Sequence, residues 1–109
     1  MGYALAGVLH GLRRERSVRF QAVVLILVLT ALAVFRPEPI WWAAVALASA
    51  GVLAAELLNT AIETLADHLS PEFHPQVRVV KDCAAAAVLV CVIGALAVAV
   101  ALAVHLLRG

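Results

Sequence analysis

Charged residues are scarce in this sequence, and long apolar runs take their place. Of its 109 residues, 14% are Asp, Glu, Lys or Arg, 65% are hydrophobic, and the mean hydropathy is +1.05. A soluble domain of this length cannot bury so much apolar surface. The composition therefore excludes an ordinary water-soluble domain and predicts an integral membrane protein. The formal net charge of +1 is too small to indicate any class of partner.

The usual nucleotide and redox motifs are absent as well. The chain has no GxxxxGK[ST], GxGxxG, HRD or DFG segment, and its six glycines are scattered. Its two cysteines, Cys83 and Cys91, have an i, i+8 spacing that fits neither a metal motif nor a CxxC pair. We interpret them as small buried apolar residues. Short motifs alone therefore identify neither ATP nor a metal cluster.

Three long apolar runs predict three membrane-spanning helices. Ahead of the first run, apolar residues recur at helical spacing and arginines occupy other positions. This pattern is typical of an amphipathic helix in the membrane interface. The first run lacks a small-residue cleavage site, so we expect it to be retained. We therefore expect a single domain over 1–109, with a surface helix at 1–18 and helices that include the spans at 19–36, 40–67 and 82–107.

Basic residues are distributed unevenly between the two sides of the predicted membrane. Four arginines precede the first span, and Arg78 and Lys81 lie in the polar connection at 68–82 before the third span. The opposite side carries only Arg36 and Arg108. The positive-inside rule therefore places the N-terminus and the 68–82 connection in the cytoplasm, and the C-terminus outside.

The most informative stretch is the polar end of the second span. Glu56, Asn59, Glu63 and Asp67 have an i, i+3, i+7, i+11 spacing, which puts them on one helix face. Glu56 lies about 24 Å along the helix from Ile40, near the far edge of a hydrocarbon core about 30 Å thick. We expect this acidic face to cross the membrane boundary, with Glu56 as its most buried member. Acidic groups in such a place usually mark function.

The chemistry of these side chains suits phosphate transfer. Clustered carboxylates repel one another unless a cation or proton lies between them, and Mg²⁺ binds carboxylate and phosphate oxygens together. Lys81 and the nearby Arg78 supply positive charge for phosphates, and Glu56 is suited to accept a proton from a hydroxyl. The residues therefore predict phosphate chemistry on a membrane-soluble substrate.

Each polar residue also has a purely structural interpretation. Asn59 can hydrogen-bond between helices, and Glu63 and Asp67 can form a solvated helix end. Glu15 can pair with Arg19 at i+4. The charged residues before the third span can mark the membrane edge and cap its helix. The shared helix face favours the functional interpretation, because chance does not readily align so many polar groups.

Five segments have spacings that are highly specific in combination. They are Gly7-Val8-Leu9-His10, Glu15-Arg16-Ser17-Val18-Arg19, Glu56-Leu57-Leu58-Asn59-Thr60-Ala61-Ile62-Glu63 followed by Asp67, Ser70-Pro71-Glu72-Phe73-His74-Pro75, and Val80-Lys81-Asp82. Together they resemble the small prokaryotic diacylglycerol kinase / undecaprenol kinase family of integral membrane lipid kinases. The resemblance covers nearly the whole chain.

The resemblance implies an all-α membrane protein, with an amphipathic surface helix and three transmembrane helices per subunit, that forms a homotrimer in the bacterial inner membrane. It implies transfer of the ATP γ-phosphate to a lipid alcohol, undecaprenol or diacylglycerol, with no nucleic acid as a partner. Glu56 would be the general base at the lipid substrate, and Glu15 and Glu63 would hold Mg²⁺. Asn59 and Asp67 would support the site. The nucleotide would be bound by Tyr3, Glu15, Glu63, Glu72, Phe73, His74, Lys81 and Asp82.

The acceptor lipid stays open at this point. The 70–75 segment is more similar to the undecaprenol kinase branch, but Ser17 replaces the Asn that this branch often carries. Two other function classes also fit a small helical membrane protein. A proton-coupled exporter would need its carboxylate near mid-bilayer, whereas Glu56 is expected near one edge. A non-catalytic assembly protein would leave the acidic face unexplained.

Overall fold

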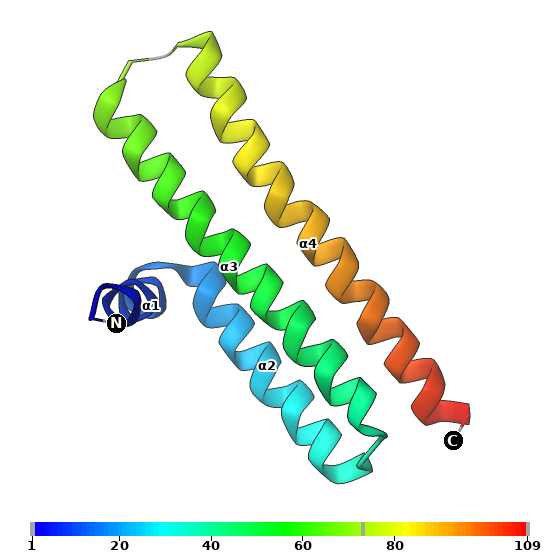
Figure 1. Cartoon of the computed structure of the whole chain (residues 1–109). Coiled ribbons are helices and arrows are strands. Elements are labelled where there is room, and N and C mark those ends of the chain that lie inside the picture. Colours follow the sequence, from blue (N-terminus) through cyan, green and yellow to red (C-terminus); the bar gives the residue numbers. More distant parts are fainter. Residues whose placement is uncertain (1, 73, 109) are drawn as a thin grey trace.

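The computed structural model describes residues 2–72 and 74–108. These residues form the helices α1 (Gly2–Arg14), α2 (Arg16–Phe35), α3 (Pro39–Leu69) and α4 (Pro75–Arg108). Figure 1 shows α2, α3 and α4 side by side as an antiparallel bundle with α3 in the centre, and α1 lying across it beside the start of α2. The predicted all-α chain, with one N-terminal helix and three long apolar helices, is confirmed.

α2, α3 and α4 are each long and apolar enough to cross a membrane. α3 and α4 contain 31 and 34 residues, so they are about 46 and 51 Å long and exceed a hydrocarbon core of about 30 Å. Their paired ends extend past α1 in Figure 1. Most large apolar side chains on the three long helices are exposed in the single chain, as expected for helices whose surroundings are lipid or other subunits.

The elbow between α1 and α2 lies at Glu15, whereas the sequence pattern put this boundary between residues 18 and 19. Glu15 has an extended backbone (φ −104°, ψ 117°) and is the N-cap residue of α2. Nη1 of Arg19 donates to the carbonyl oxygens of Arg13 at 2.8 Å and Leu12 at 3.5 Å. The last carbonyls of a helix have no intrahelical partner, and here the next helix supplies one. The chain therefore turns earlier than its amphipathic pattern suggests.

The approach of α1 to α3 depends on a glycine. Gly11 is buried, and a Cβ atom at this position would lie 2.9 Å from Cδ2 of Leu57 and 3.6 Å from both methyl groups of Val18. Val18 itself is only 1% exposed. The absence of a side chain at Gly11 therefore lets α1 cross α3 at Leu57, the residue next to Glu56.

The apolar core lies at the other end of the bundle. Leu32, Val45 and Leu102, one from each long helix, are buried together near the α2–α3 hairpin. Beside them the Trp41 ring stacks on His105, with the ring centroids 5.2 Å apart. This core joins the three long helices at the end remote from α1, and Val52 and Ala84 are buried further along α3 and α4.

The connection expected at 68–82 is mostly helical. α3 continues to Leu69, and α4 begins at Pro75, where proline suits the first helical position. The Gln76 N–H donates to Nδ1 of His74 at 3.2 Å, which satisfies one of the unpaired donors at the helix start. Lys81 and the residues around it therefore stand on a helix that faces α3, and not in a loop.

Candidate functional site

The predicted acidic face lies on the uninterrupted helix α3. Glu56 and Asn59 are half-buried, and Glu63 and Asp67 are exposed. Because α1 crosses α3 beside Leu57, Glu56 lies at the level of α1, and Glu63 and Asp67 lie progressively beyond it. The helix thus carries its polar groups from the crossing point of α1 to the projecting end of the bundle.

Glu56 is bonded to the neighbouring helix. The Ser17 hydroxyl, in the first turn of α2, donates to Oε2 of Glu56 at 3.1 Å. The two residues are 39 positions apart, so this bond exists only through the packing of α2 against α3. One carboxylate oxygen of Glu56 is thereby engaged, and Oε1 has no recorded partner among the described residues.

Asn59 carries an acceptor atom without a donor. Its Nδ2 donates to Oε1 of Glu63 at 3.4 Å, which is a long hydrogen bond. Its Oδ1 is buried and has no hydrogen-bond partner within the described part of the chain. A buried carbonyl oxygen that lacks a donor is costly, and such atoms call for a water, an ion or a ligand group. Asn59 therefore offers an oxygen ligand between Glu56 and Glu63.

A pocket of about 320 Å³ lies between the end of α3 and the start of α4. Lys81 on α4 forms an ion pair with Asp67 on α3, and Arg78 pairs with Asp82 within α4 at 3.2 Å. The structure thus gathers most of the residues assigned to the nucleotide on sequence grounds. Those that line the pocket are Glu63, Glu72, His74, Lys81 and Asp82, and Asp67, which was assigned a supporting role, lines it as well. Phe73, the remaining residue assigned from this segment, lies outside the described residues.

The charge of this pocket is unbalanced. Its lining includes four carboxylates, from Glu63, Asp67, Glu72 and Asp82, and two cationic groups, from Arg78 and Lys81. A polyphosphate would be repelled by this set unless a cation entered with it. The donor chemistry, carboxylate oxygens near two cationic side chains, fits Mg²⁺ accompanied by phosphate.

Glu15 is not part of this pocket. It is half-buried at the elbow, and its side chain makes no capping hydrogen bond to α2. The ion pair with Arg19, considered above, does not form between these residues, because the guanidinium bonds to the α1 carbonyls. Within residues 2–72 and 74–108, no three His, Cys, Asp or Glu side chains converge as a metal cluster. A magnesium ion here would have to complete its shell with phosphate and water, as Mg²⁺ commonly does.

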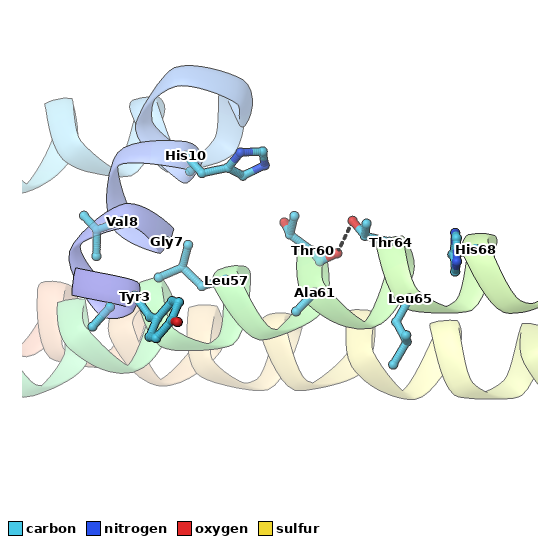
Figure 2. Close-up of a pocket in the computed structure, with 12 residues that line it drawn as sticks. Tyr3, Gly7, Val8, His10, Leu57, Thr60, Ala61, Thr64, Leu65 and His68 are labelled. Atoms are coloured by element: carbon cyan, nitrogen blue, oxygen red, sulfur yellow. Dashed lines mark hydrogen bonds between the residues drawn. The ribbon is translucent and has the colours of Figure 1, made fainter. Parts of the chain in front are cut away.

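Tyr3 also lies elsewhere. It is 96% exposed and lines a separate groove of about 590 Å³ between α1 and α3. In Figure 2, His10 projects from α1 above this groove, and Thr60, Thr64 and His68 project from successive turns of α3. The Thr64 hydroxyl donates to the Thr60 carbonyl oxygen at 2.8 Å.

Of the groove residues, the three on α3 were not assigned a role from the sequence. Thr60, Thr64 and His68 recur every four residues, a spacing that marks a second polar stripe next to the acidic face. That stripe becomes recognisable as a site only when the position of α1 is known, because α1 supplies the opposite wall.

Comparison with known proteins agrees with this architecture. A sequence model described as prokaryotic diacylglycerol kinase matches residues 2–103, which include all of α1, α2 and α3 and most of α4. The chain belongs to the prokaryotic diacylglycerol kinase family. The matched range contains both the elbow at Glu15 and the residues of the α3–α4 pocket.

Three relatives illustrate the range of this family. The chain is 38% identical over 97 residues to a diacylglycerol kinase of Synechocystis, an alignment that covers 88% of the chain and 55% of that relative. It is 35% identical over 99 residues to the undecaprenol kinase of Bacillus subtilis, covering 86% and 80%. It is 43% identical over 89 residues to a diacylglycerol kinase of Pseudomonas aeruginosa, covering 79% and 70%. The names of these relatives therefore refer to two different acceptor lipids, diacylglycerol and undecaprenol.

Proposed function

We propose that this protein is a membrane lipid kinase that transfers the ATP γ-phosphate to the hydroxyl of a lipid alcohol, undecaprenol or diacylglycerol. The observation that carries the proposal is a single helix face on α3. It joins a half-buried carboxylate at the level of α1, Glu56, to a charged pocket at the projecting end of the bundle. Membership of the prokaryotic diacylglycerol kinase family and the names of the relatives support the same conclusion.

The α3–α4 pocket is the proposed nucleotide end of the site. Lys81, with Arg78 nearby, offers cationic donors to phosphate oxygens, and Glu72, His74 and Asp82 complete the lining. Glu63 lines this pocket and is a proposed ligand of Mg²⁺, and Glu15, which lies outside the pocket at the start of α2, is proposed as the second ligand. The ion would neutralise phosphate charge in a lining that is otherwise too acidic for a triphosphate. Asn59, which bonds to Glu63, supports this metal ligand.

Glu56 is the proposed base at the lipid end. The acceptor hydroxyl gives its proton to the Glu56 carboxylate, and its oxygen forms a bond to the γ-phosphorus. The bond between that phosphorus and the β–γ bridging oxygen breaks, and ADP leaves with the electron pair. A carboxylate at the level of α1 suits an acceptor whose alkyl chain stays in lipid while its hydroxyl reaches the membrane surface.

The same position argues against a proton-coupled exporter. An exporter's coupling carboxylate is expected near the middle of the bilayer. Glu56 instead lies where α1 crosses α3, and it bonds to the first turn of α2.

We also propose a homotrimer in the bacterial inner membrane, with α1 and the α3–α4 pocket on the cytoplasmic side. Neighbouring subunits would then complete a site that one chain leaves open to the surroundings.

Phosphate transfer in mixed micelles tests the proposal. Purified protein receives labelled ATP with undecaprenol or with diacylglycerol, in the presence and absence of Mg²⁺. We expect label in one or both lipids only when Mg²⁺ is present. No label in either lipid would contradict the kinase assignment, and crosslinking that finds only active monomers would contradict the trimer.

The role of Glu56 has a separate test. Glu56→Gln should lower kcat about 10²- to 10⁴-fold, the usual contribution of a general base, while ATP binding is retained. Glu38→Gln is the matched control, because Glu38 is an exposed glutamate at the opposite end of α3. A fully active Glu56→Gln variant would refute the base assignment.

A further inference from the structure

The hydrogen bond from Ser17 to Glu56 has a distinctive place in the molecule. Among the described residues it is the sole side-chain hydrogen bond recorded between α2 and α3. It ends on Glu56, the half-buried carboxylate, and not on one of the exposed acids further along α3. The bond therefore acts on the group to which the proposed function assigns proton removal.

The backbone that follows Ser17 is held by contacts of the next two residues. The next residue, Val18, is 1% exposed and packs where α1 meets α3. One residue further, the Arg19 guanidinium bonds to two carbonyl oxygens of α1. These contacts hold the first turn of α2 in place, so the position of the Ser17 backbone is set by packing, and its exposed hydroxyl is directed by the hydrogen bond to Glu56.

A glutamate without such a bond would have considerable freedom. Its three side-chain torsions give the carboxylate many positions, and a reacting group must be held close to its productive geometry. The Ser17 hydroxyl engages Oε2 and leaves Oε1 without a recorded partner in the described residues. One oxygen is thus held while the other can accept a proton.

We propose that Ser17 is a positioning residue for phosphate transfer, which donates a hydrogen bond to Oε2 of Glu56 and aims Oε1 at the acceptor hydroxyl. This inference rests on the proposed function, because it presupposes that Glu56 is the base. Ser17 occupies a position where the undecaprenol kinase branch often carries Asn. The inference therefore also assigns a role to this difference.

The test compares three variants in the mixed-micelle assay. Ser17→Ala removes the hydrogen-bond donor to Glu56, and Ser17→Thr keeps it. Thr30→Ala is the control, because the Thr30 hydroxyl donates to the carbonyl oxygen of Ile26 within α2. We expect Ser17→Ala to lower kcat about 10- to 100-fold, the range for a slightly misplaced reacting group, with unchanged KM for ATP and for the lipid. Ser17→Thr should stay within about twofold of the parent kcat, because the hydroxyl is kept.

Two further measurements separate positioning from a merely structural role. The melting temperature of Ser17→Ala in detergent should equal that of Thr30→Ala, because the apolar core lies at the far end of the bundle. In a Glu56→Gln background, Ser17→Ala should cause no additional loss of the residual rate. An additional loss as large as that in the parent protein would overturn the inference.

The outcomes distinguish this inference from the function on which it rests. If the parent protein transfers no label to lipid, the kinase proposal itself fails. If the parent protein is active and Ser17→Ala keeps its kcat, only the role of Ser17 is refuted. Failure of Ser17→Thr to restore kcat, when Ser17→Ala has lost it, would likewise refute hydrogen bonding as the cause.

Discussion

Lys81 of α4 forms an ion pair with Asp67 of α3 across the pocket between the two helices. The two side chains are 32% and 64% exposed, and exposed pairs stabilise proteins by only about 0–1 kcal/mol. Stability is therefore a weak reason for this pair to exist. Its position in a pocket lined by further carboxylates suggests that Asp67 holds the ammonium group in place for a phosphate.

Replacing Lys81 should weaken nucleotide binding. Lys81→Met keeps much of the side-chain length and removes the charge. Hydrogen bonds to charged groups contribute about 1.5–3 kcal/mol, so we expect the KM for ATP to rise about 10- to 100-fold. Arg108→Met, at the opposite end of α4, is the control and should leave the KM unchanged. Steady-state kinetics with varied ATP measure the effect, and an unchanged KM in Lys81→Met would show that phosphate binds elsewhere.

Asp67→Asn should produce a smaller rise in the KM for ATP, because it loosens Lys81 without removing its charge. The melting temperature should change little, as expected for an exposed pair. A lower KM in this variant would contradict the supporting role of Asp67 and would mean that its carboxylate competes with phosphate for Lys81.

Glu63→Gln should change the magnesium requirement. The amide keeps the shape of the side chain but loses the charge that attracts the ion. We expect the Mg²⁺ concentration for half-maximal rate to rise about tenfold or more, the size of effect seen when metal sites lose an interaction. Titration of activity with Mg²⁺ at fixed ATP measures this, with Glu38→Gln as the control. An unchanged titration curve would remove Glu63 from the metal ligands.

Gly11→Val should disturb the crossing of α1 and α3. A Cβ atom at Gly11 would already lie 2.9 Å from Cδ2 of Leu57, and valine adds two methyl groups. Overpacking of this kind costs about 1–3 kcal/mol, so the melting temperature and the activity should both fall. Gly51→Val has no atom within 4 Å of its Cβ position and is the control. Leu57→Ala in the Gly11→Val background should restore part of the loss, and no restoration would argue against this clash as the cause.

Tyr3→Ala tests the use of the α1–α3 groove. If Tyr3 contacts nucleotide, as its family position implies, the KM for ATP should rise while the KM for the lipid stays unchanged. The structure places Tyr3 in a different groove from Lys81, so this prediction is independent of the previous ones. A rise in the lipid KM alone would assign the groove to the acceptor.

Much of the fold follows from local sequence patterns. The three spans follow from composition and run length, and the alignment of Glu56, Asn59 and Glu63 follows from the helical period. The boundaries of the helices were harder to predict from the sequence. α1 ends before Glu15 because Arg19 caps it from the next helix, and α4 starts at Pro75 where the sequence indicated a loop. Both differences come from contacts that a pattern of hydrophobicity does not contain.

The sequence by itself determined that this is a membrane protein with an acidic helix face at the end of its second span, because periodicity and composition are properties of neighbouring residues. Only the tertiary structure decided that Ser17 bonds to Glu56, that Lys81 pairs with Asp67, and that Tyr3 and Glu15 lie outside the α3–α4 pocket. Such pairs depend on how far each helix is rotated and shifted against the next, and many distant side chains set that geometry together.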